Sequence, residues 1–323
     1  MIRRVFAVLD PFVMLLIGTV TLASLLPARG GMASVVDVIA DAGIVLLFFL
    51  HGARLSREAI WAGARNWRLH LATLSVTFAL FPLLGLGIVA AHLVPAEFAT
   101  GLLFLTLLPS TVQSSIAFTA IARGNVAAAV CAASFSNLLG IFLTPALVAL
   151  LMGGATGGLS WGSVGTIFAQ LMLPFVLGHV LRPWIGAFVL RHKTLTTRVD
   201  RGSILLVVYA AFGAAVVEGL WSRVAPGHLL AIAALSLALL AVVMGATLTL
   251  GRMIGLSRED AVVLLFCGSK KSLASGVPMA GVLFPGPQVG IVLLPMMIFH
   301  QLQLIACAMI APCLGRRAEL SET

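Results

Sequence analysis

Two adjacent lysines stand within an otherwise apolar stretch of the chain. The segment Gly268-Ser269-Lys270-Lys271-Ser272 lies between Ala261 and Leu283, where most other residues are apolar or small. A lysine at the centre of a membrane helix costs roughly 2.5–3.5 kcal/mol on insertion scales. Two such lysines about double that cost unless the backbone or a cavity stabilises them. This segment is therefore the first candidate for function.

A second polar segment, Leu108-Pro109-Ser110-Thr111-Val112-Gln113-Ser114-Ser115, interrupts another apolar stretch about 160 residues earlier. Proline removes a backbone donor and clashes with the preceding turn, and serine or threonine hydroxyls can bond the backbone groups that are freed. One interpretation is a simple proline kink. The other is an unwound centre at which a half-helix begins, with its N-terminal amides facing a substrate. The matching break at Gly268–Ser272 favours the second interpretation.

The two lysines lack a carboxylate partner at the middle of any apolar stretch. The acids near these stretches lie close to their ends: Asp10, Asp37, Asp41 and Glu218. An unpaired ammonium can bind carbonyls at the C-terminal end of a half-helix, meet an anionic substrate, or become neutral because burial disfavours its charged form. Adjacent helical residues point about 100° apart, so Lys270 and Lys271 serve different places in a helix.

Further polar side chains occur in two other apolar stretches, and they are Ser134, Ser136, Asn137, His300, Gln301 and Gln303. Such groups either join helices or supply oxygen ligands to a small cation. Asn125 is interpreted as a helix N-cap and His51 as an interfacial residue at the end of a span. The four cysteines have no CxxC spacing and are interpreted as apolar core residues rather than metal ligands.

The composition predicts a membrane protein with several spans. The chain has 323 residues, of which 60% are hydrophobic and 10% charged, whereas soluble domains carry about 25% charged residues. Several apolar runs have the length of about 20 residues that crosses a bilayer core. The formal charge of +9 is assigned to cytoplasmic loop anchors rather than to a nucleic-acid surface. The basic N-terminus is interpreted as the start of a retained first span.

Ten spans are predicted, at residues 10–26, 34–51, 70–93, 98–122, 126–151, 162–189, 202–219, 228–251, 259–284 and 288–312. With the N-terminus in the cytoplasm, Arg29 and Arg223 are the only basic residues in outside loops. Arg54, Arg198 and Arg201 fall in inside loops. This asymmetry indicates ten spans with both termini cytoplasmic. The protein is expected in the inner membrane of a bacterial cell.

Three pairs of features recur at similar offsets along the chain. Pro11-Phe12-Val13 is matched by Pro174-Phe175-Val176, the break at Pro109 by the break at Gly268–Ser272, and Pro145 by Pro312. These offsets predict a duplicated five-span unit, with residues 1–152 as the first copy and 153–323 as the second. Because five is odd, the second copy must be inverted in the membrane, as in secondary transporters.

Three stretches carry a resemblance to a known family. They are Leu108–Val112 through Gly124-Asn125, Leu139–Pro145, and Gly268–Leu273 through Gly276–Met279. The chain resembles the bile acid:sodium symporter (SBF-like) family. Within that family it is most similar to the branch that contains the seventh vertebrate member and the bacterial relatives of that member. The resemblance implies a panel of spans 1, 2, 6 and 7, a core of spans 3–5 and 8–10, and broken spans 4 and 9 that cross in the core. It also implies that substrate binds between panel and core and moves by alternating access.

The resemblance further implies two sodium sites, but their ligands are largely replaced here. Ala129 and Ala133 stand at the span-five hydroxyl positions, with Ser134 beside them, and Phe266 and Lys270 stand at the span-nine Glu and Gln positions. We therefore hypothesise that the Lys270 ammonium takes the place of a sodium ion. Lys271 is then expected to face the cavity and attract an anionic group.

These inferences predict an all-α secondary transporter of a small organic anion in the lipid bilayer. It is not expected to be an enzyme, to bind nucleic acid or to hold a cofactor; Na⁺ is the one ion that the resemblance suggests. The expected substrate contacts are Ser110, Thr111, Lys271, Ser272 and Ser275. The expected coupling-site residues are Ser114, Ser115, Ser134, Asn137, Ser269 and Lys270.

Other functions remain open from the sequence. They are a proton-coupled or uncoupled carrier, a non-transporting regulator of ion homeostasis, and an intramembrane enzyme built on Lys270, Ser272 and His300. The substrate and the oligomeric state are not predicted.

Overall fold

The computed structural model describes residues 11–54, 66–152, 168–284 and 286–322, and over these ranges the chain forms helices and turns without a strand. Some sequence predictions fall outside these ranges. They concern the basic N-terminus, residue 10 of the first predicted span, residues 162–167 of the sixth, and the start of the second repeat at residue 153.

The helices follow the apolar stretches of the sequence. In chain order they are α2 (Pro11–Leu25), α3 (Gly31–Arg54), α5 (Trp67–Ser75), the π-helix η1 (Val76–Leu80), α6 (Phe81–Ala90), α7 (Ala96–Leu107), α8 (Gln113–Ile121), α9 (Val126–Met152), the π-helix η2 (Phe168–Met172), α11 (Leu173–Arg191), α12 (Lys193–Val217), α13 (Leu220–Arg223), α14 (Pro226–Met253), α15 (Arg258–Gly268), α16 (Leu273–Leu283) and α17 (Gly286–Glu322).

Within the described ranges, 7 helical stretches are long and apolar enough to cross a membrane, and α7 and most of α2 form shorter apolar helices. Large apolar side chains cover much of the outer surface; Leu150 is 78% exposed and Met253 83% exposed. Such a surface is stable against lipid but not against water. The predicted all-helical membrane protein is therefore confirmed, whereas the number of ten spans and the inverted repeats stay predictions.

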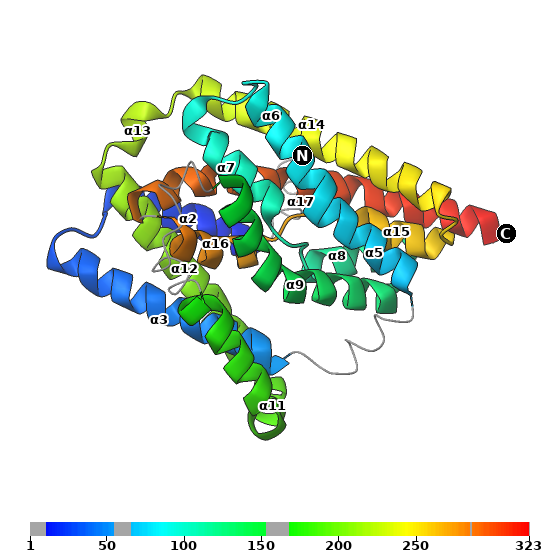
Figure 1. Ribbon diagram of the computed structural model, residues 1–323, viewed down its shortest axis with the longest axis horizontal. Helices are drawn as coiled ribbons and strands as arrows, with labels where there is room; N and C mark the ends of the chain where they lie inside the picture. Colours follow the sequence, from blue (N-terminus) through cyan, green and yellow to red (C-terminus); the bar gives the residue numbers. More distant parts are fainter. Residues whose placement is uncertain (1–10, 55–65, 153–167, 285, 323) are drawn as a thin grey trace.

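The helices pack in two groups (Figure 1). In the first group, which contains α2, α3, α11 and α12, helix α12 packs against α2 and α3, and α3 packs closely against α11. The second group contains the helices from α5 to α9 and α14 to α17, and α12 packs against α16 and α17 of that group. The close contact between α3 and α11 depends on glycine: a Cβ added to Gly52 would lie 2.0 Å from the Phe175 carbonyl oxygen, and one added to Gly178 would lie 2.0 Å from the Phe49 oxygen.

Two of the apolar stretches are interrupted, as the sequence predicted. Helix α7 ends at Leu107, and Leu108 is extended, with φ −76° and ψ 155°. That conformation is the one favoured for a residue before proline. Helix α8 begins at Gln113. The second break separates α15 from α16, where Ser272 is the N-cap and its hydroxyl oxygen accepts from the Ser275 amide at 3.1 Å.

Helices α12 and α17 extend furthest beyond their predicted spans, and these two boundary predictions were wrong. Helix α12 begins at Lys193 rather than residue 202, so Arg198 and Arg201 are helical and not part of a loop. Helix α17 continues to Glu322, past the predicted end at residue 312. A hydropathy boundary marks where apolar residues stop, whereas a helix continues through polar residues until a breaker intervenes.

Candidate functional site

The first break leaves five consecutive carbonyls, from Thr106 to Ser110, without the usual intrahelical donors. Three of them find partners outside α7 and α8. The Thr144 hydroxyl donates to the Leu107 oxygen at 2.8 Å, and the Asn137 amide donates to the Ser110 oxygen at 2.7 Å. The Ser272 amide of the second break donates to the Pro109 oxygen at 2.8 Å. This last bond joins the two breaks directly.

The other two carbonyls are bound by the Lys271 side chain. Its ammonium donates to the Thr106 oxygen at 2.8 Å and the Leu108 oxygen at 2.7 Å. A third bond, at 2.7 Å, goes to the Thr77 oxygen in η1. There the Phe81 amide bonds the Val76 oxygen, and Pro82, the next residue, has no N–H to offer Thr77. Lys271 thus supplies donors where two proline-containing segments lack them.

The Lys271 backbone is held as firmly as its side chain. The Gln303 side chain on α17 accepts from the Lys271 amide and donates to the Lys271 carbonyl, both at 2.9 Å. Lys271 is 1% exposed, and its ammonium lies 4.2 Å from the centroid of the Phe81 ring. The expectation that this ammonium faces the substrate cavity does not match its position, because the ammonium binds backbone oxygens within the protein.

Lys270 begins a chain of hydroxyl groups between the two breaks. Its ammonium lies 4.6 Å from the Phe118 ring centroid and donates to the Ser114 hydroxyl at 3.0 Å. Ser114 donates to Thr111 at 3.0 Å, Thr111 pairs with Ser115 at 2.9 Å, and Ser115 donates to the Phe266 carbonyl at 2.9 Å. The chain ends on a carbonyl of α15, where the helix dipole is negative.

The positions that the resemblance assigned to sodium ligands are apolar and buried here, apart from Lys270 itself. Ala129, Ala133 and Phe266 are fully buried, and the Phe118 and Phe266 rings pack with centroids 5.9 Å apart. These are the positions at which the resemblance implied oxygen ligands. The Ser269 hydroxyl, also expected at the coupling site, donates to the Leu265 carbonyl of its own helix.

A cavity of about 380 Å³ lies between the two helix groups. Of the expected site residues, those that line it are Thr111, Ser114, Ser134, Asn137, Ser272 and Ser275. Those buried outside its lining are Ser110, Ser115, Ser269, Lys270 and Lys271. Asn137 connects the breaks at this cavity, because it accepts from the Ser275 hydroxyl at 2.8 Å while donating to the Ser110 oxygen. The structure therefore divides the expected residues into a cavity wall and a buried support.

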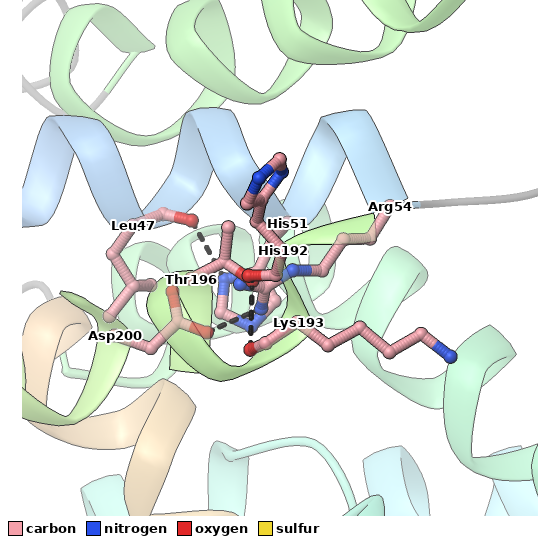
Figure 2. Close-up of polar contacts among 7 residues, drawn as sticks. All are labelled: Leu47, His51, Arg54, His192, Lys193, Thr196 and Asp200. Atoms are coloured by element: carbon pink, nitrogen blue, oxygen red, sulfur yellow. Dashed lines mark hydrogen bonds and ion pairs between the residues drawn. The ribbon is translucent and has the colours of Figure 1, made fainter. Parts of the chain in front are cut away.

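Charged residues that were not predicted from the sequence also line the cavity, and Figure 2 shows Arg54 and Asp200 among them. Arg54 at the end of α3 forms an ion pair with Asp200 on α12, and His51 lies beside them with Nδ1 2.9 Å from the Leu47 oxygen. All three line the cavity, as does Arg201. The available signal was Asp200, a lone acid among the basic residues Lys193, Arg198 and Arg201.

Two other predictions can be checked here. Asn125 is an N-cap, as expected, because its side-chain oxygen accepts from the Ala128 amide at 3.0 Å. The possible Ser–Lys–His enzyme site is not assembled: the Ser272 hydroxyl pairs with Ser275 at 3.0 Å, and Lys270 donates to Ser114. Hydrogen bonds between Ser272 and Lys270, which a nucleophile and its base require, are not formed.

Secondary transporters commonly place their substrate site at interrupted membrane helices, and the cavity here is lined by residues of two such breaks. The chain belongs to the SBF-like CPA transporter family, whose sequence model matches residues 10–316. This confirms the resemblance and makes the protein a membrane transporter by family.

Several relatives are similar along nearly their whole length. The "Uncharacterized protein PA2026" of Pseudomonas aeruginosa is 53% identical over 314 residues, which cover 96% of this chain and 94% of the relative. The "Putative symporter YfeH" of Escherichia coli is 51% identical over 320 residues, covering 98% and 96%. The sodium/bile acid cotransporter 7 of Danio rerio is 24% identical over 314 residues, covering 93% and 92%.

Proposed function

We propose that the protein is a secondary transporter of a small organic anion, which binds in the cavity between the two helix groups. The single observation that carries this proposal is that the cavity wall contains the first residues of two half-helices. Gln113 and Ser114 begin α8, and Leu273 and Ala274 begin α16. The N-terminal end of a helix attracts negative charge.

The start of α8 is the better anion site of the two. Its N-cap, Val112, offers no side-chain hydrogen bond to the first turn, whereas Ser272 caps α16. Lys270 donates to Ser114 on this turn and adds positive charge behind the cavity. The amides at the start of α8 are therefore not occupied by an N-cap side chain and are available to an anionic group.

Alternating access is proposed from the way in which the cavity is built. Phe12, Phe48 and Phe175 line it from the first helix group, and the helix breaks line it from the second. Relative motion of the two groups would open and close the cavity without separating the bonded pair of breaks. The α12 contacts with α16 and α17 lie at the boundary that such a motion must change.

The coupling proposal is that ammonium groups take the structural place of a coupling cation. Three carbonyl oxygens converge on Lys271 at 2.7–2.8 Å, as oxygens do around a bound cation. The Lys270 ammonium contacts the Phe118 ring and donates to one hydroxyl oxygen, that of Ser114, and apolar residues stand at Ala129, Ala133 and Phe266, where the resemblance implied oxygen ligands. Transport is therefore proposed to be independent of sodium. The carrier is then either uncoupled or coupled to protons.

A Gln113→Glu variant tests the anion site. The added carboxylate lies in the first turn of α8, where it favours the helix dipole, so the melting temperature should stay constant or rise. Because it repels an anion in the cavity, stabilisation by octanoate and uptake of labelled octanoate into proteoliposomes should fall by about tenfold or more. Unchanged octanoate binding in Gln113→Glu would contradict the proposed site.

Gln288→Glu is the matched control. Gln288 is exposed in the first turn of α17 and does not line the cavity, so the same change of charge should leave octanoate binding and uptake unaltered. If the folded wild-type protein neither binds nor transports octanoate or other small carboxylates, the carrier proposal fails and a regulatory role is favoured.

Exchange of sodium for potassium tests the coupling proposal. We expect equal melting temperatures and equal octanoate uptake in the two salts at one ionic strength, because no sodium ligand set is proposed. Stabilisation or uptake that requires sodium would show that a sodium site exists and that the lysines do not replace it.

A further inference from the structure

The charged residues of the cavity form a cluster that is separate from the helix breaks. We define the arginine cluster as Arg54, Asp200 and Arg201. Arg54 ends α3, and the other two lie on α12, so the cluster belongs to the first helix group. The hydroxyl and amide groups at the breaks belong to the second group. The cavity thus has polar groups at both walls, with apolar side chains that include Leu47, Ile141 and Phe175 also lining it.

The ion pair in the cluster is incomplete. Arg54 Nη1 donates to Asp200 Oδ2, but among the residues that the structure describes, Arg54 Nη2 and Asp200 Oδ1 are buried without a hydrogen-bond partner. A buried polar atom of a charged group that lacks a partner is costly. If the ion pair served only to join α3 to α12, we would expect two parallel hydrogen bonds between the guanidinium and both carboxylate oxygens, as in bidentate Arg–carboxylate pairs.

The cluster has an excess of positive charge. Arg201 follows Asp200 directly, lines the same cavity and lies with its guanidinium 5.4 Å from the Phe12 ring centroid. No ion pair joins Arg201 to a carboxylate in the described part of the chain. Two guanidinium groups therefore stand with one carboxylate at the cavity wall, and the excess positive charge favours the binding of a second anionic group.

His51 adds a neutral acceptor to the cluster. Its Nδ1 lies 2.9 Å from the Leu47 oxygen, and because a carbonyl only accepts, Nδ1 carries the proton. In the neutral ring, Nε2 is then an acceptor. With Asp200 Oδ1, the cluster offers guanidinium donors for a carboxylate and acceptors for a hydroxyl group or a water molecule next to it.

We infer that the arginine cluster is a second substrate subsite, which binds a carboxylate through Arg54 and Arg201. This inference rests on the proposed transport function and narrows its substrate class. The substrate is an elongated organic anion with an apolar body and an acidic group at each end. One end binds at the start of α8 and the other at the arginine cluster, so that a single molecule contacts both helix groups.

The test compares two series of probes of equal length in the purified protein. Adipate, suberate and sebacate carry two carboxylates, whereas hexanoate, octanoate and decanoate carry one. At least one dicarboxylate should bind about tenfold more tightly than its monocarboxylate counterpart, as judged from the ligand-dependent rise in melting temperature, because it makes an additional charge-assisted contact. Equal or weaker binding of every dicarboxylate would overturn the inference.

Arg201→Gln identifies the subsite. In this variant, the preferred dicarboxylate should bind only as tightly as the monocarboxylate of equal length. The affinity for the monocarboxylate should stay at its wild-type value. Arg198→Gln is the matched control, since Arg198 is exposed on the same helix and does not line the cavity, and it should preserve the dicarboxylate preference. A preference retained in Arg201→Gln would contradict the role assigned to the cluster.

The double variant Arg54→Gln/Asp200→Asn separates binding from stability. It removes the ion pair without leaving one charge unpaired, so it tests whether the pair is only a brace between α3 and α12. A brace alone predicts a lower melting temperature with an intact dicarboxylate preference, which would overturn the inference. Loss of the preference is the expected result.

The outcomes for the two proposals are distinct. If monocarboxylates bind and are transported but the second carboxylate adds nothing, the arginine cluster is not a subsite while the carrier proposal stands. If neither series binds or is taken up by wild-type protein, the carrier proposal fails as well.

Discussion

At the scale of single residues, Lys271 has the largest structural consequence. Its ammonium satisfies the Thr77, Thr106 and Leu108 carbonyls, which have lost main-chain donors at prolines and at a helix end. Lys271→Met keeps much of the side-chain volume but leaves these oxygens unpaired, at about 1–3 kcal/mol each. We therefore expect the variant to lose about 3 kcal/mol or more of stability, measured as unfolding in detergent micelles.

Lys193→Met provides the comparison for this residue. Lys193 is exposed at the start of α12, so its replacement should change stability by less than about 0.5 kcal/mol. If Lys271→Met unfolded at the wild-type temperature, the contacts of Lys271 with the three carbonyls would contribute little to stability. Lys271 would then again be a candidate for substrate binding.

At the scale of helices, the contact between α3 and α11 depends on two reciprocal glycines. A Cβ at Gly52 would overlap the Phe175 oxygen, and one at Gly178 would overlap the Phe49 oxygen, each at 2.0 Å. Since these obstacles are backbone atoms, the helices must separate to admit a methyl group. Gly52→Ala and Gly178→Ala should each destabilise the protein by about 1–3 kcal/mol in thermal unfolding.

Gly245→Ala is the control for helix propensity. Gly245 lies in α14 and a Cβ there would meet nothing within 4 Å, so alanine should be neutral or stabilise the helix by up to about 1 kcal/mol. Tolerance of alanine at both Gly52 and Gly178 would mean that α3 and α11 do not need their close approach.

At the scale of the whole molecule, the charge distribution predicts one orientation in the membrane. Arg29 lies in the turn before α3, and Lys193 begins α12. The two are predicted to lie on opposite sides, with Arg29 outside and Lys193 in the cytoplasm. In a background without the four native cysteines, Arg29→Cys should react with an impermeant maleimide in intact spheroplasts. Lys193→Cys should react only after the membrane is permeabilised.

The opposite labelling pattern would place the termini outside the cytoplasm. Labelling of both cysteines in intact spheroplasts would instead contradict the predicted number of crossings between residues 29 and 193. Replacement of Cys313 is essential in this experiment, because that thiol is exposed.

The sequence by itself determined the class of protein and the places of the helix breaks. Apolar length specifies the spans because a bilayer has a fixed thickness, and Pro109 ends α7 through local sterics that require no tertiary partner. The positions of Ser114 and Ser275 near the breaks were also predicted, because hydroxyl groups can bond the backbone groups that a break leaves free.

Only the tertiary structure decided what each lysine contacts and what completes the cavity. Lys270 and Lys271 are neighbours in sequence, yet Lys270 donates to the Ser114 hydroxyl of α8 and Lys271 donates to carbonyls of η1, α7 and the first break. Arg54 and Asp200, 146 residues apart, form their pair only because α3 packs against α12. Such contacts depend on helix rotation and packing, which hydropathy and local propensity do not specify, since both describe a residue's own segment and not its neighbour across the fold.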